Sequence, residues 1–418
     1  MSALRAKFDV LLPDYFKQPH LINKESIKQK ASAHFEMLKQ TRRYLHQHPE
    51  LSFHESKTAK YISGLLTDWN IEHQTGVAGN GIVGLIKGRN PGTKTIALRA
   101  DIDALPINEK NNVEYRSLNS GVMHACGHDV HTSCLLGAVK ILDELKQEFD
   151  GTVKFIFQPA EETLPGGAQQ MIAEGVLENP KPLSIVAQHV FPDLPVGKVG
   201  FKKGEYMASS DEINLYVKGK GGHAAIPHSG DDTVFTAAQL IVDIKKKVAE
   251  QTSLEIPVVL SFGKIIGNGA HNVFPAKVSI HGTLRTFDES WRRQVHQIIS
   301  EVAATMSVAN NLTCEVDIQK GYPVLINDDK TTGQAVEAAK EFLGSEQVVS
   351  LPRRMTVEDF AYFAQKVPAC FYRLGVANPE KGITSGLHTP TFDVDEESIK
   401  TGTGLLTWIA LKQLEKTK

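Results

Sequence analysis

Short apolar runs alternate with segments of helical periodicity over the first half of the chain. Four of these runs have the length of buried strands and lie at residues 82–86, 95–98, 153–157 and 185–187. Apolar positions before and between them recur at helical spacing, beginning with Phe35, Leu38 and Leu45. This alternation predicts an α/β domain whose central sheet is largely parallel.

The pattern changes near residue 210. Strand patterns at 211–217, 257–266, 277–285 and 313–318, together with helical patterns at 232–249 and 289–307, follow the order βαββαβ. Such a unit can bury one face of its own sheet. Because signals like those of the first domain return after residue 322, we expect a catalytic domain formed by 1–209 and 321–418, interrupted by an inserted domain at 210–320. Residues 1–30 are expected to be an extension.

Length, charge and cysteine content narrow the class of protein. A chain of 418 residues is long enough for two domains. Lys and Arg number 46 against 48 Asp and Glu, so no excess positive charge indicates a nucleic acid or a membrane surface as partner. No apolar run of about 18 residues occurs and the N-terminus does not resemble a signal peptide, which predicts a cytoplasmic protein. The four cysteines are expected to be free thiols.

The densest group of chemically active side chains lies at 124–131, where Cys126 and His128 are separated by one glycine. A thiolate and an imidazole are both ligands for zinc and similar divalent ions, and a helix that starts nearby would favour the thiolate. On this segment alone, a buried thiol beside a polar loop is the more common explanation.

Four further side chains that can bind a metal or activate a water occur later in the chain. Glu161 and Glu162 come after the run at 153–157, His189 after that at 185–187, and His388 lies in the C-terminal part. In extended backbone, two consecutive carboxylates would point to opposite sides, one toward a metal and one toward a reacting water. Taken singly, each is as well explained by a solvated loop or a hydrogen-bonded histidine. Their repeated occurrence at strand ends favours a common site.

Other candidates support this site. Asp103 follows the run at 95–98 and could accept a hydrogen bond from a ligating histidine. In the inserted domain, His223 lies in a glycine-rich turn that matches no phosphate-binding motif. Asn272 and Arg285 are candidate partners for a carboxylate, because arginine matches a carboxylate with two parallel hydrogen bonds. A purely structural role is the alternative for each.

Together these segments resemble the M20 metallopeptidase superfamily, and in particular its aminoacylase-like amidohydrolase branch. The resemblance covers nearly the whole chain through the motifs RADIDALP, MHACGHDVHT, QPAEE, GKGGHAAIPH, NVFP, GTLRTF, VEDFAYF and LHTPTFD. It implies a phosphorylase/hydrolase-like catalytic α/β domain with an inserted ferredoxin-like lid that forms a homodimer. It further implies two divalent ions (Mn, Zn, Co or Ni) held by five residues: Cys126, His128, Glu162, His189 and His388.

The resemblance also implies roles for the remaining candidates. Glu161 would be the general base, Asp103 the support of a ligand, and His223 a group that reaches the active site of the partner subunit. Asn272 and Arg285 would hold the substrate carboxylate. The expected reaction is hydrolysis of the amide bond of a small N-acyl amino acid. An exopeptidase of the same superfamily is the first alternative, and a catalytically silent metal-binding or ligand-binding protein is the second.

Overall fold

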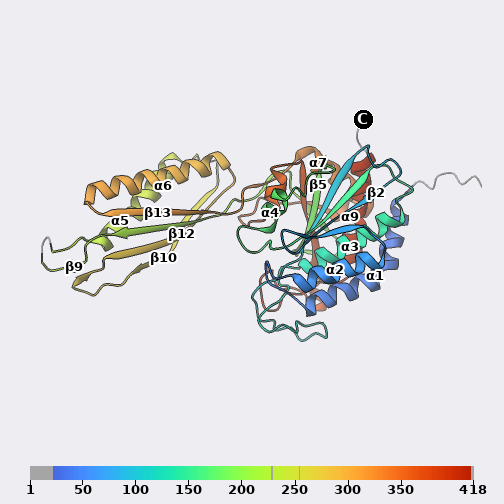
Figure 1. Ribbon diagram of the computed structural model, residues 1–418, viewed down its shortest axis with the longest axis horizontal. Coiled ribbons are helices and arrows are strands. Elements are labelled where there is room, and N and C mark those ends of the chain that lie inside the picture. The colour runs from blue at the N-terminus through green and yellow to red at the C-terminus, as the bar shows by residue number, and fades with distance from the viewer. Residues whose placement is uncertain (1–21, 227–228, 254, 416–418) are drawn as a thin grey trace, which may run out of the picture.

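The computed structural model describes residues 22–226, 229–253 and 255–415, and the chain forms two lobes (Figure 1). The larger lobe contains an eight-stranded sheet and the smaller lobe, residues 211–320, a four-stranded sheet. The expected extension at 1–30 lies outside the described residues as far as residue 21. From Lys24 onward the chain is already helical, because α1 begins there with Asn23 as its N-cap.

The large sheet is mixed, with parallel strands at its centre. Strand β3 pairs in parallel with β4 and β5, and β5 pairs in parallel with β16, whereas β1, β2 and β6 pair antiparallel with their inner neighbours. In spatial order the strands are β1 (His73–Val77), β2 (Gly81–Lys87), β4 (Thr152–Gln158), β3 (Thr95–Asp101), β5 (Ile185–Pro195), β16 (Ala369–Ala377), β6 (Val199–Phe201) and β15 (Val348–Ser350).

Helices cover both faces of this sheet. One face packs against α1 (Lys24–Gln47), α2 (Ser56–Asp68), α3 (His128–Glu144), α7 (Asp329–Leu343) and α9 (Ser398–Glu415). The opposite face packs against α4 (Gly167–Ala173), α8 (Ala361–Ala364) and a two-stranded sheet of β7 (Gly204–Met207) and β14 (Leu325–Asn327). Two short 3-10 helices, η1 (Ser345–Gln347) and η2 (Pro379–Lys381), complete the lobe. None of the helices in the described part of the chain has the length and apolar character needed to cross a membrane.

Burial on both faces explains why the central strands are continuous apolar runs. Every residue of β3 is buried. Leu98 points into the core beneath α3 and α9, and its neighbour Ala97 points into the core on the opposite face. A charged residue inside such a strand needs an ion-pair or hydrogen-bond partner. The presence of Arg99 in β3 therefore indicates a buried network of charged side chains.

The smaller lobe is an antiparallel sheet covered on one face by two helices. Its elements are β8 (Asp211–Lys218), α5 (Thr233–Gln251), β10 (Val258–Gly267), β12 (Lys277–Thr286), α6 (Glu289–Asn310) and β13 (Thr313–Lys320), with the strand order β10-β12-β8-β13. Alternate residues of β8, Ile213, Leu215 and Val217, are fully buried against these helices. A separate two-stranded antiparallel sheet pairs β9 (Gly222–His223) with β11 (Val273–Phe274).

A buried ion cluster ties α1 to α3 and to the segment that precedes α9. Arg42 is 0% exposed and its Nε donates to Asp129 at 2.8 Å. Its other nitrogens reach Asp393 at 3.2 Å and Glu396 at 3.4 Å, and its guanidinium lies over the ring of Tyr115. Because Asp129 is also buried, its charge depends on Arg42 and on His46, whose Nδ1 lies 2.8 Å from the same carboxylate oxygen.

Replacing Arg42 by alanine should therefore lower the free energy of unfolding by about 3–5 kcal/mol, because the buried carboxylate of Asp129 loses its guanidinium partner and keeps His46 as its cationic neighbour. The matched control is Arg43→Ala, since the neighbouring Arg43 side chain is 29% exposed and pairs with Glu396 at the surface. That change should cost at most about 1 kcal/mol. Urea denaturation followed by circular dichroism measures both, and equal midpoints for the two variants would refute the assignment.

Candidate metal centre

The candidate residues converge at the carboxyl edge of the parallel strands. Strand β3 ends at Asp101, β4 ends at Gln158, and His189 lies within β5, which continues to Pro195. Helix α3 begins at His128, beside this edge. Strands that run in parallel bring their ends to one side of the sheet, which is where open α/β sheets bind ligands.

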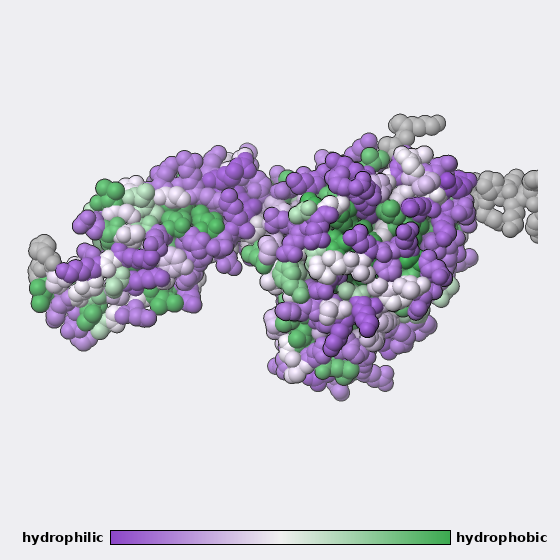
Figure 2. Space-filling model, viewed as in Figure 1, coloured by the Kyte–Doolittle hydropathy of each residue, from purple (hydrophilic) through white to green (hydrophobic). Residues whose placement is uncertain are grey.

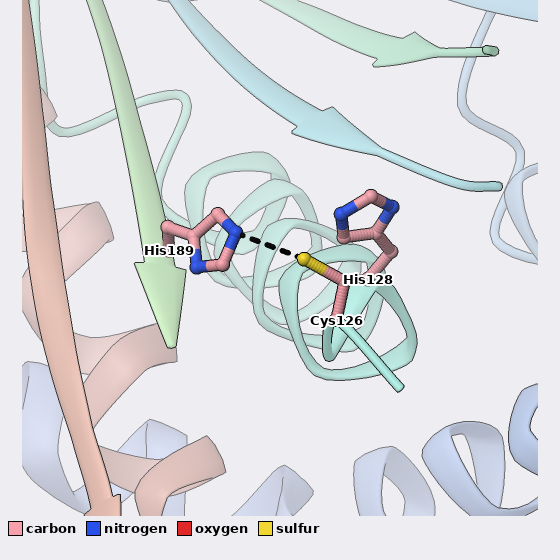
Figure 3. Close-up of side chains that lie close together, drawn as sticks. All are labelled: Cys126, His128 and His189. Carbon is pink, nitrogen blue, oxygen red and sulfur yellow. Dashed lines mark hydrogen bonds between the residues drawn. The ribbon is translucent and has the colours of Figure 1, made fainter. Parts of the chain in front are cut away.

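Gly127 allows the residues on either side of it to enter the site. Its φ is +84°, a left-handed conformation that side chains disfavour. A Cβ atom at this position would lie 2.4 Å from Cγ2 of Val190 on β5. Glycine thus lets the start of α3 approach β5 closely, with Cys126 and His128 both directed into the group of ligands (Figure 3).

Cys126 is central to this group. Its Sγ lies 3.3 Å from Nε2 of His189 and 3.3 Å from Nε2 of His388. Two sets of donor atoms consequently overlap at the sulfur: one is Cys126, His128 and His189, and the other is Cys126, Glu162 and His388. Within each set, all donor atoms lie within 4.8 Å of one another.

Two buried donor atoms at this point have no hydrogen-bond partner among the described residues: Nε2 of His128 and Oε1 of Glu162. They lie 3.8 Å apart. His388 Nε2 is 3.3 Å from the same Glu162 oxygen. Donors at zinc-like bond lengths in a tetrahedral arrangement lie about 3.3–3.8 Å from one another, so the spacing and the missing partners both fit a divalent ion.

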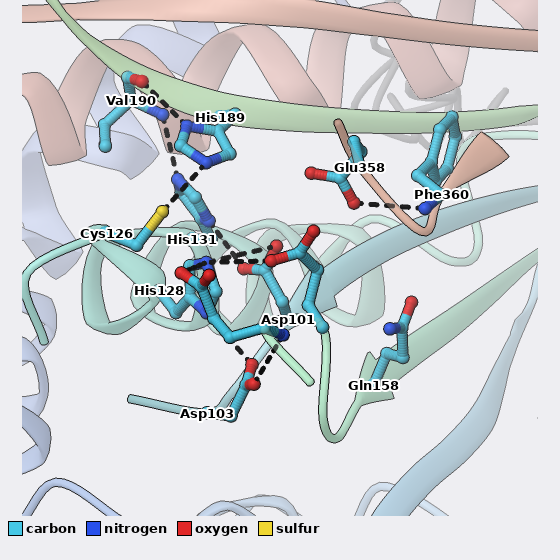
Figure 4. A network of polar contacts seen from close by, with 12 residues as sticks. Asp101, Asp103, Cys126, His128, His131, Gln158, His189, Val190, Glu358 and Phe360 are labelled. Carbon is cyan, nitrogen blue, oxygen red and sulfur yellow. Dashed lines mark hydrogen bonds and ion pairs between the residues drawn. The ribbon is translucent and has the colours of Figure 1, made fainter. Parts of the chain in front are cut away.

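The opposite ring nitrogens of two of these histidines are already occupied. Nδ1 of His128 is 3.1 Å from Oδ1 of Asp103, and Nδ1 of His189 is 2.7 Å from the carbonyl oxygen of Val190. A histidine that donates through Nδ1 keeps the lone pair of Nε2 free for a metal, and ligating histidines commonly show this arrangement. Asp103 also accepts from Ser52 and from the backbone of Glu162, which fixes its position. Figure 4 shows Asp103 beside His128.

His131 lies close by but is unsuited to bind an ion. Its Nε2 accepts a hydrogen bond from the backbone N–H of Val190 at 2.8 Å, and its Nδ1 donates to Asp101 at 2.6 Å. Both ring nitrogens are thus occupied, as Figure 4 shows. The group formed by Asp101, His128 and His131 is therefore better described as a support for α3 than as a third metal site.

Without a cation, the surroundings of the site favour the protonated forms of both Cys126 and His128. Burial raises the pKa of the Cys126 thiol well above its usual value, and the carboxylates of Glu162 and Glu161 raise it further. Burial opposes protonation of His128, but Asp101 and Asp103 outweigh it and raise its pKa to about 10. A divalent ion would replace the proton on both groups, because it stabilises the thiolate and binds neutral imidazole.

The backbone around the two glutamates differs from the extended form that the sequence suggested. Ala160 has a φ of +53°, so the chain turns sharply after β4. As a result the two carboxylates do not point to opposite sides: Glu161 Oε2 is 4.0 Å and Glu162 Oε1 is 3.8 Å from the same nitrogen of His128. His388 also has a positive φ, +59°. Such conformations cost about 1–3 kcal/mol and concentrate at functional sites.

Glu161 belongs to a second acidic group that the sequence did not reveal. It lies with Glu358 and Asp359, and its Oε1 accepts from the backbone N–H of Asp359 at 3.4 Å. Burial raises the pKa of Glu161 well above its usual range, and the charge of Glu358 adds to this. Arg99, 1% exposed, pairs with Glu358 at 3.0 Å and with Asp359 at 2.9 Å.

A cavity of about 530 Å³ opens onto the ligands and includes Arg285 in its wall. Arg285 donates to the carbonyl of Met355 at 3.0 Å. The other two candidates from the smaller lobe do not line this cavity. His223 is exposed on the two-stranded sheet of β9 and β11, and the carbonyl of the neighbouring Asn272 accepts from the backbone N–H of Ala224. Figure 1 places β9 at the end of the smaller lobe remote from the large sheet.

Comparison with known proteins agrees with this geometry. The chain is 39% identical over 358 residues to N-acetyl-L-cysteine deacetylase of Bacillus subtilis, which covers 86% of this chain and 83% of that protein. It is 35% identical to thermostable carboxypeptidase 2 of Saccharolobus solfataricus, with 89% of this chain and 94% of that protein covered. Its fold matches a dinuclear metal-binding peptidase of the M20 family from Bacillus subtilis, with a TM-score of 0.79, 34% identity, and 92% and 100% of the two chains covered.

A family model also covers the segments that carry the candidate ligands. The model of peptidase family M20/M25/M40 matches residues 97–412, a range that contains every candidate ligand from Cys126 to His388. The match covers well over half of the chain, and the resemblance noted in the motifs is thereby confirmed. The protein belongs to peptidase family M20/M25/M40.

Proposed function

We propose that this protein is a metal-dependent amidohydrolase that cleaves the amide bond of small N-acyl amino acids to a carboxylic acid and a free amino acid. The observation that carries the proposal is the pair of donor sets that share Cys126. Two ions that share one thiolate would lie close together, as a dinuclear hydrolytic site requires. The similarity to a deacetylase of N-acetyl-L-cysteine supports an N-acyl amino acid as substrate.

In this proposal Cys126, His128, Glu162, His189 and His388 hold two divalent ions of Mn, Zn, Co or Ni. Such ions, when bound, supply Lewis acidity that polarises a carbonyl oxygen and acidifies water. Asp103 keeps the His128 ring in the tautomer that leaves Nε2 free. Arg285, in the cavity wall, binds the α-carboxylate of the substrate through its guanidinium.

Glu161 acts as the general base and then as the general acid. Its carboxylate accepts the proton of the attacking water and delivers it to the leaving nitrogen. Its backbone carbonyl accepts from the hydroxyl of Tyr322 at 2.6 Å, and its side chain accepts from the N–H of Asp359, so its orientation is fixed. Burial and the nearby carboxylates raise the pKa of Glu161. They therefore favour the form of Glu161 that holds the proton between its removal from the water and its delivery to the leaving nitrogen.

A peptidase of the same family is the competing function, since the chain also resembles a carboxypeptidase. A substrate with a free amino terminus needs an acidic group near its ammonium. The candidate ligand at position 189 is a neutral histidine: burial lowers its pKa well below the usual value, and the charge of Arg373 lowers it further. Position 189 therefore carries no negative charge for a cationic substrate terminus, which favours a neutral acyl group at this point of the cavity.

We propose further that residues 210–320 form a ferredoxin-like lid through which two copies of the chain dimerise. Phe235, Ala238 and Val242 form an exposed stripe on α5 at helical spacing. Strand β10 is an edge of its sheet and exposes Ile265 and Ile266. Figure 2 shows apolar residues at the surface of this lobe. An apolar stripe beside an unpaired strand edge suits a symmetric contact with a second copy.

Dimerisation would also give the remote two-stranded sheet of β9 and β11 a function. His223 and Asn272 lie on neighbouring segments that do not reach the cavity of their own chain. In a dimer, this small sheet of each chain can extend to the cavity of the partner, where His223 would donate to the oxyanion and Asn272 would hold the substrate carboxylate.

The test of function is hydrolysis after metal removal and reconstitution with each candidate ion. Glu161→Gln should keep its metal, measured by atomic emission, and lose about 10²–10⁴ in kcat on N-acetyl amino acids. Glu162→Ala should lose metal as well as activity, because it removes a ligand. A panel of N-acetyl, N-benzoyl and unblocked dipeptides separates the two functions. Near-normal turnover by Glu161→Gln, or activity that survives chelation, would refute the mechanism.

The dimer surface is tested with the double variant Phe235→Asp and Val242→Asp, which should be monomeric in light scattering because two charges would be buried at the contact. Val308→Asp is the matched control, since Val308 is 85% exposed on α6, and this variant should stay dimeric. A double variant that remains dimeric excludes this surface.

The shared site is tested by mixing inactive His223→Ala and Glu161→Gln subunits. In a symmetric dimer, half of the random pairs are hybrids, and one of the two sites in each hybrid has both residues, so about one quarter of all sites should recover. Subunit exchange is verified by mass spectrometry of differently tagged chains. Absence of recovery after complete exchange would show that His223 does not act across the dimer.

A further inference from the structure

One buried arginine in the catalytic cavity has no carboxylate within ion-pair distance in the described part of the chain. Among the arginines that the structure describes, four are buried, and three of them, Arg42, Arg99 and Arg292, each contact at least two carboxylates. The fourth, Arg373, is 3% exposed, and within the described ranges its side-chain hydrogen bonds go only to the hydroxyl of Tyr206 at 2.9 Å and the sulfur of Met207 at 3.2 Å. A buried charge without a partner is costly, so its retention indicates a ligand.

Arg373 stands beside the metal ligands. It lies on β16 directly opposite His189 on β5, and both residues line the catalytic cavity. Paired residues of adjacent strands project on the same side of a sheet. The guanidinium is therefore within reach of a small substrate whose amide bond lies at the candidate metal centre.

Aromatic rings hold the guanidinium in place but leave its charge unbalanced. The centroids of Phe191, Tyr206 and Phe371 lie 5.9, 5.6 and 5.1 Å from its Cζ. Such contacts stabilise a cation without neutralising it. An arginine side chain has five N–H donors, and the two hydrogen bonds above do not use all of them. The remaining N–H groups of Arg373 can donate to an anion.

A second arginine meets the same ring at the mouth of the cavity. The guanidinium of Arg354 lies 4.5 Å from the centroid of Phe191, its side chain is 29% exposed, and its carboxylate partner is the exposed Asp193 at 3.8 Å. Two guanidiniums over one ring repel each other unless an anion lies between them. Arg285, assigned above to the α-carboxylate, is a separate member of the cavity wall.

We propose that Arg373 and Arg354 form a second anion subsite, so that the preferred substrates are N-acyl amino acids with a second carboxylate, on the amino-acid side chain or on the acyl chain. The subsite rests on the proposed function, because the α-carboxylate and the scissile amide must occupy the places assigned to them. Arginine is suited to this role, since its planar fork binds a carboxylate through two hydrogen bonds.

The first test uses the metal-reconstituted wild-type protein and pairs of substrates that differ only in charge. N-acetyl-L-glutamate is compared with N-acetyl-L-glutamine, and N-succinyl-L-alanine with its terminal amide, while N-acetyl-L-alanine reports the basic reaction. In one pair the acid should have a kcat/KM about 10- to 100-fold higher than the amide, the range that charged hydrogen bonds provide. The pair that responds shows which end of the substrate carries the second carboxylate.

The second test removes the subsite. In Arg373→Gln the ratio of acid to amide should fall to about one, and Arg373→Lys should keep part of the preference because the charge remains. Arg353→Gln is the matched control, since Arg353 pairs with Glu205 and lies outside the cavity wall, and its ratio should equal that of the wild type. If Arg373→Gln does not fold, Arg354→Gln at the cavity mouth should lower the same ratio.

Two results would overturn the subsite while leaving the proposed function intact. One is hydrolysis of N-acetyl-L-alanine with acid and amide within about threefold in both pairs, a difference too small for a charged hydrogen bond. The other is an acid preference that persists in Arg373→Gln and Arg354→Gln. Failure of the reconstituted protein to hydrolyse any N-acyl amino acid would overturn both the proposed function and the subsite.

Discussion

The structure of the larger lobe depends on keeping several carboxylates buried and close together at one edge of the sheet. Asp101, Asp103, Glu161, Glu358 and Asp359 are all shielded from solvent. Each such charge is strongly unfavourable unless a cation or several hydrogen bonds balance it. The core around this edge is therefore organised by the partners of the carboxylates as much as by its apolar residues.

Protein groups balance some of these charges and leave others unmatched. Arg99 pairs with Asp101, Glu358 and Asp359. Toward the cavity, by contrast, the thiol of Cys126 faces Glu162, and Nε2 of His128 and Oε1 of Glu162 have no hydrogen-bond partner in the described part of the chain. The unmatched part of the network coincides with the overlapping donor sets. Arg99 balances part of the negative charge at this edge of the sheet, and bound cations would balance the rest. Metal binding would therefore stabilise the fold at the same place where it supplies the chemistry.

Sequence patterns predicted what is local and missed what depends on contacts between distant segments. The strands around Leu98 and Phe155 were visible because burial on both faces produces continuous apolar runs. The turn at Ala160 was missed, because alanine carries no signal of a left-handed conformation. The acidic pair Glu358 and Asp359 was visible only as a motif without a role, since its partner Arg99 lies some 260 positions away. The helix α1 began earlier than expected because its first turns are mostly polar.

The cavity wall beside His189 has to meet two requirements, namely a positive charge for the anionic substrates proposed above and neutral histidines for metal ions. Burial lowers the pKa of His189 well below its usual value, and Arg373 on the neighbouring strand lowers it further. The same guanidinium that would attract a carboxylate thus keeps the adjacent imidazole unprotonated and able to donate its lone pair. Since an ammonium group would be repelled from this position, one residue can favour both metal binding at His189 and acylated, acidic substrates over free peptides.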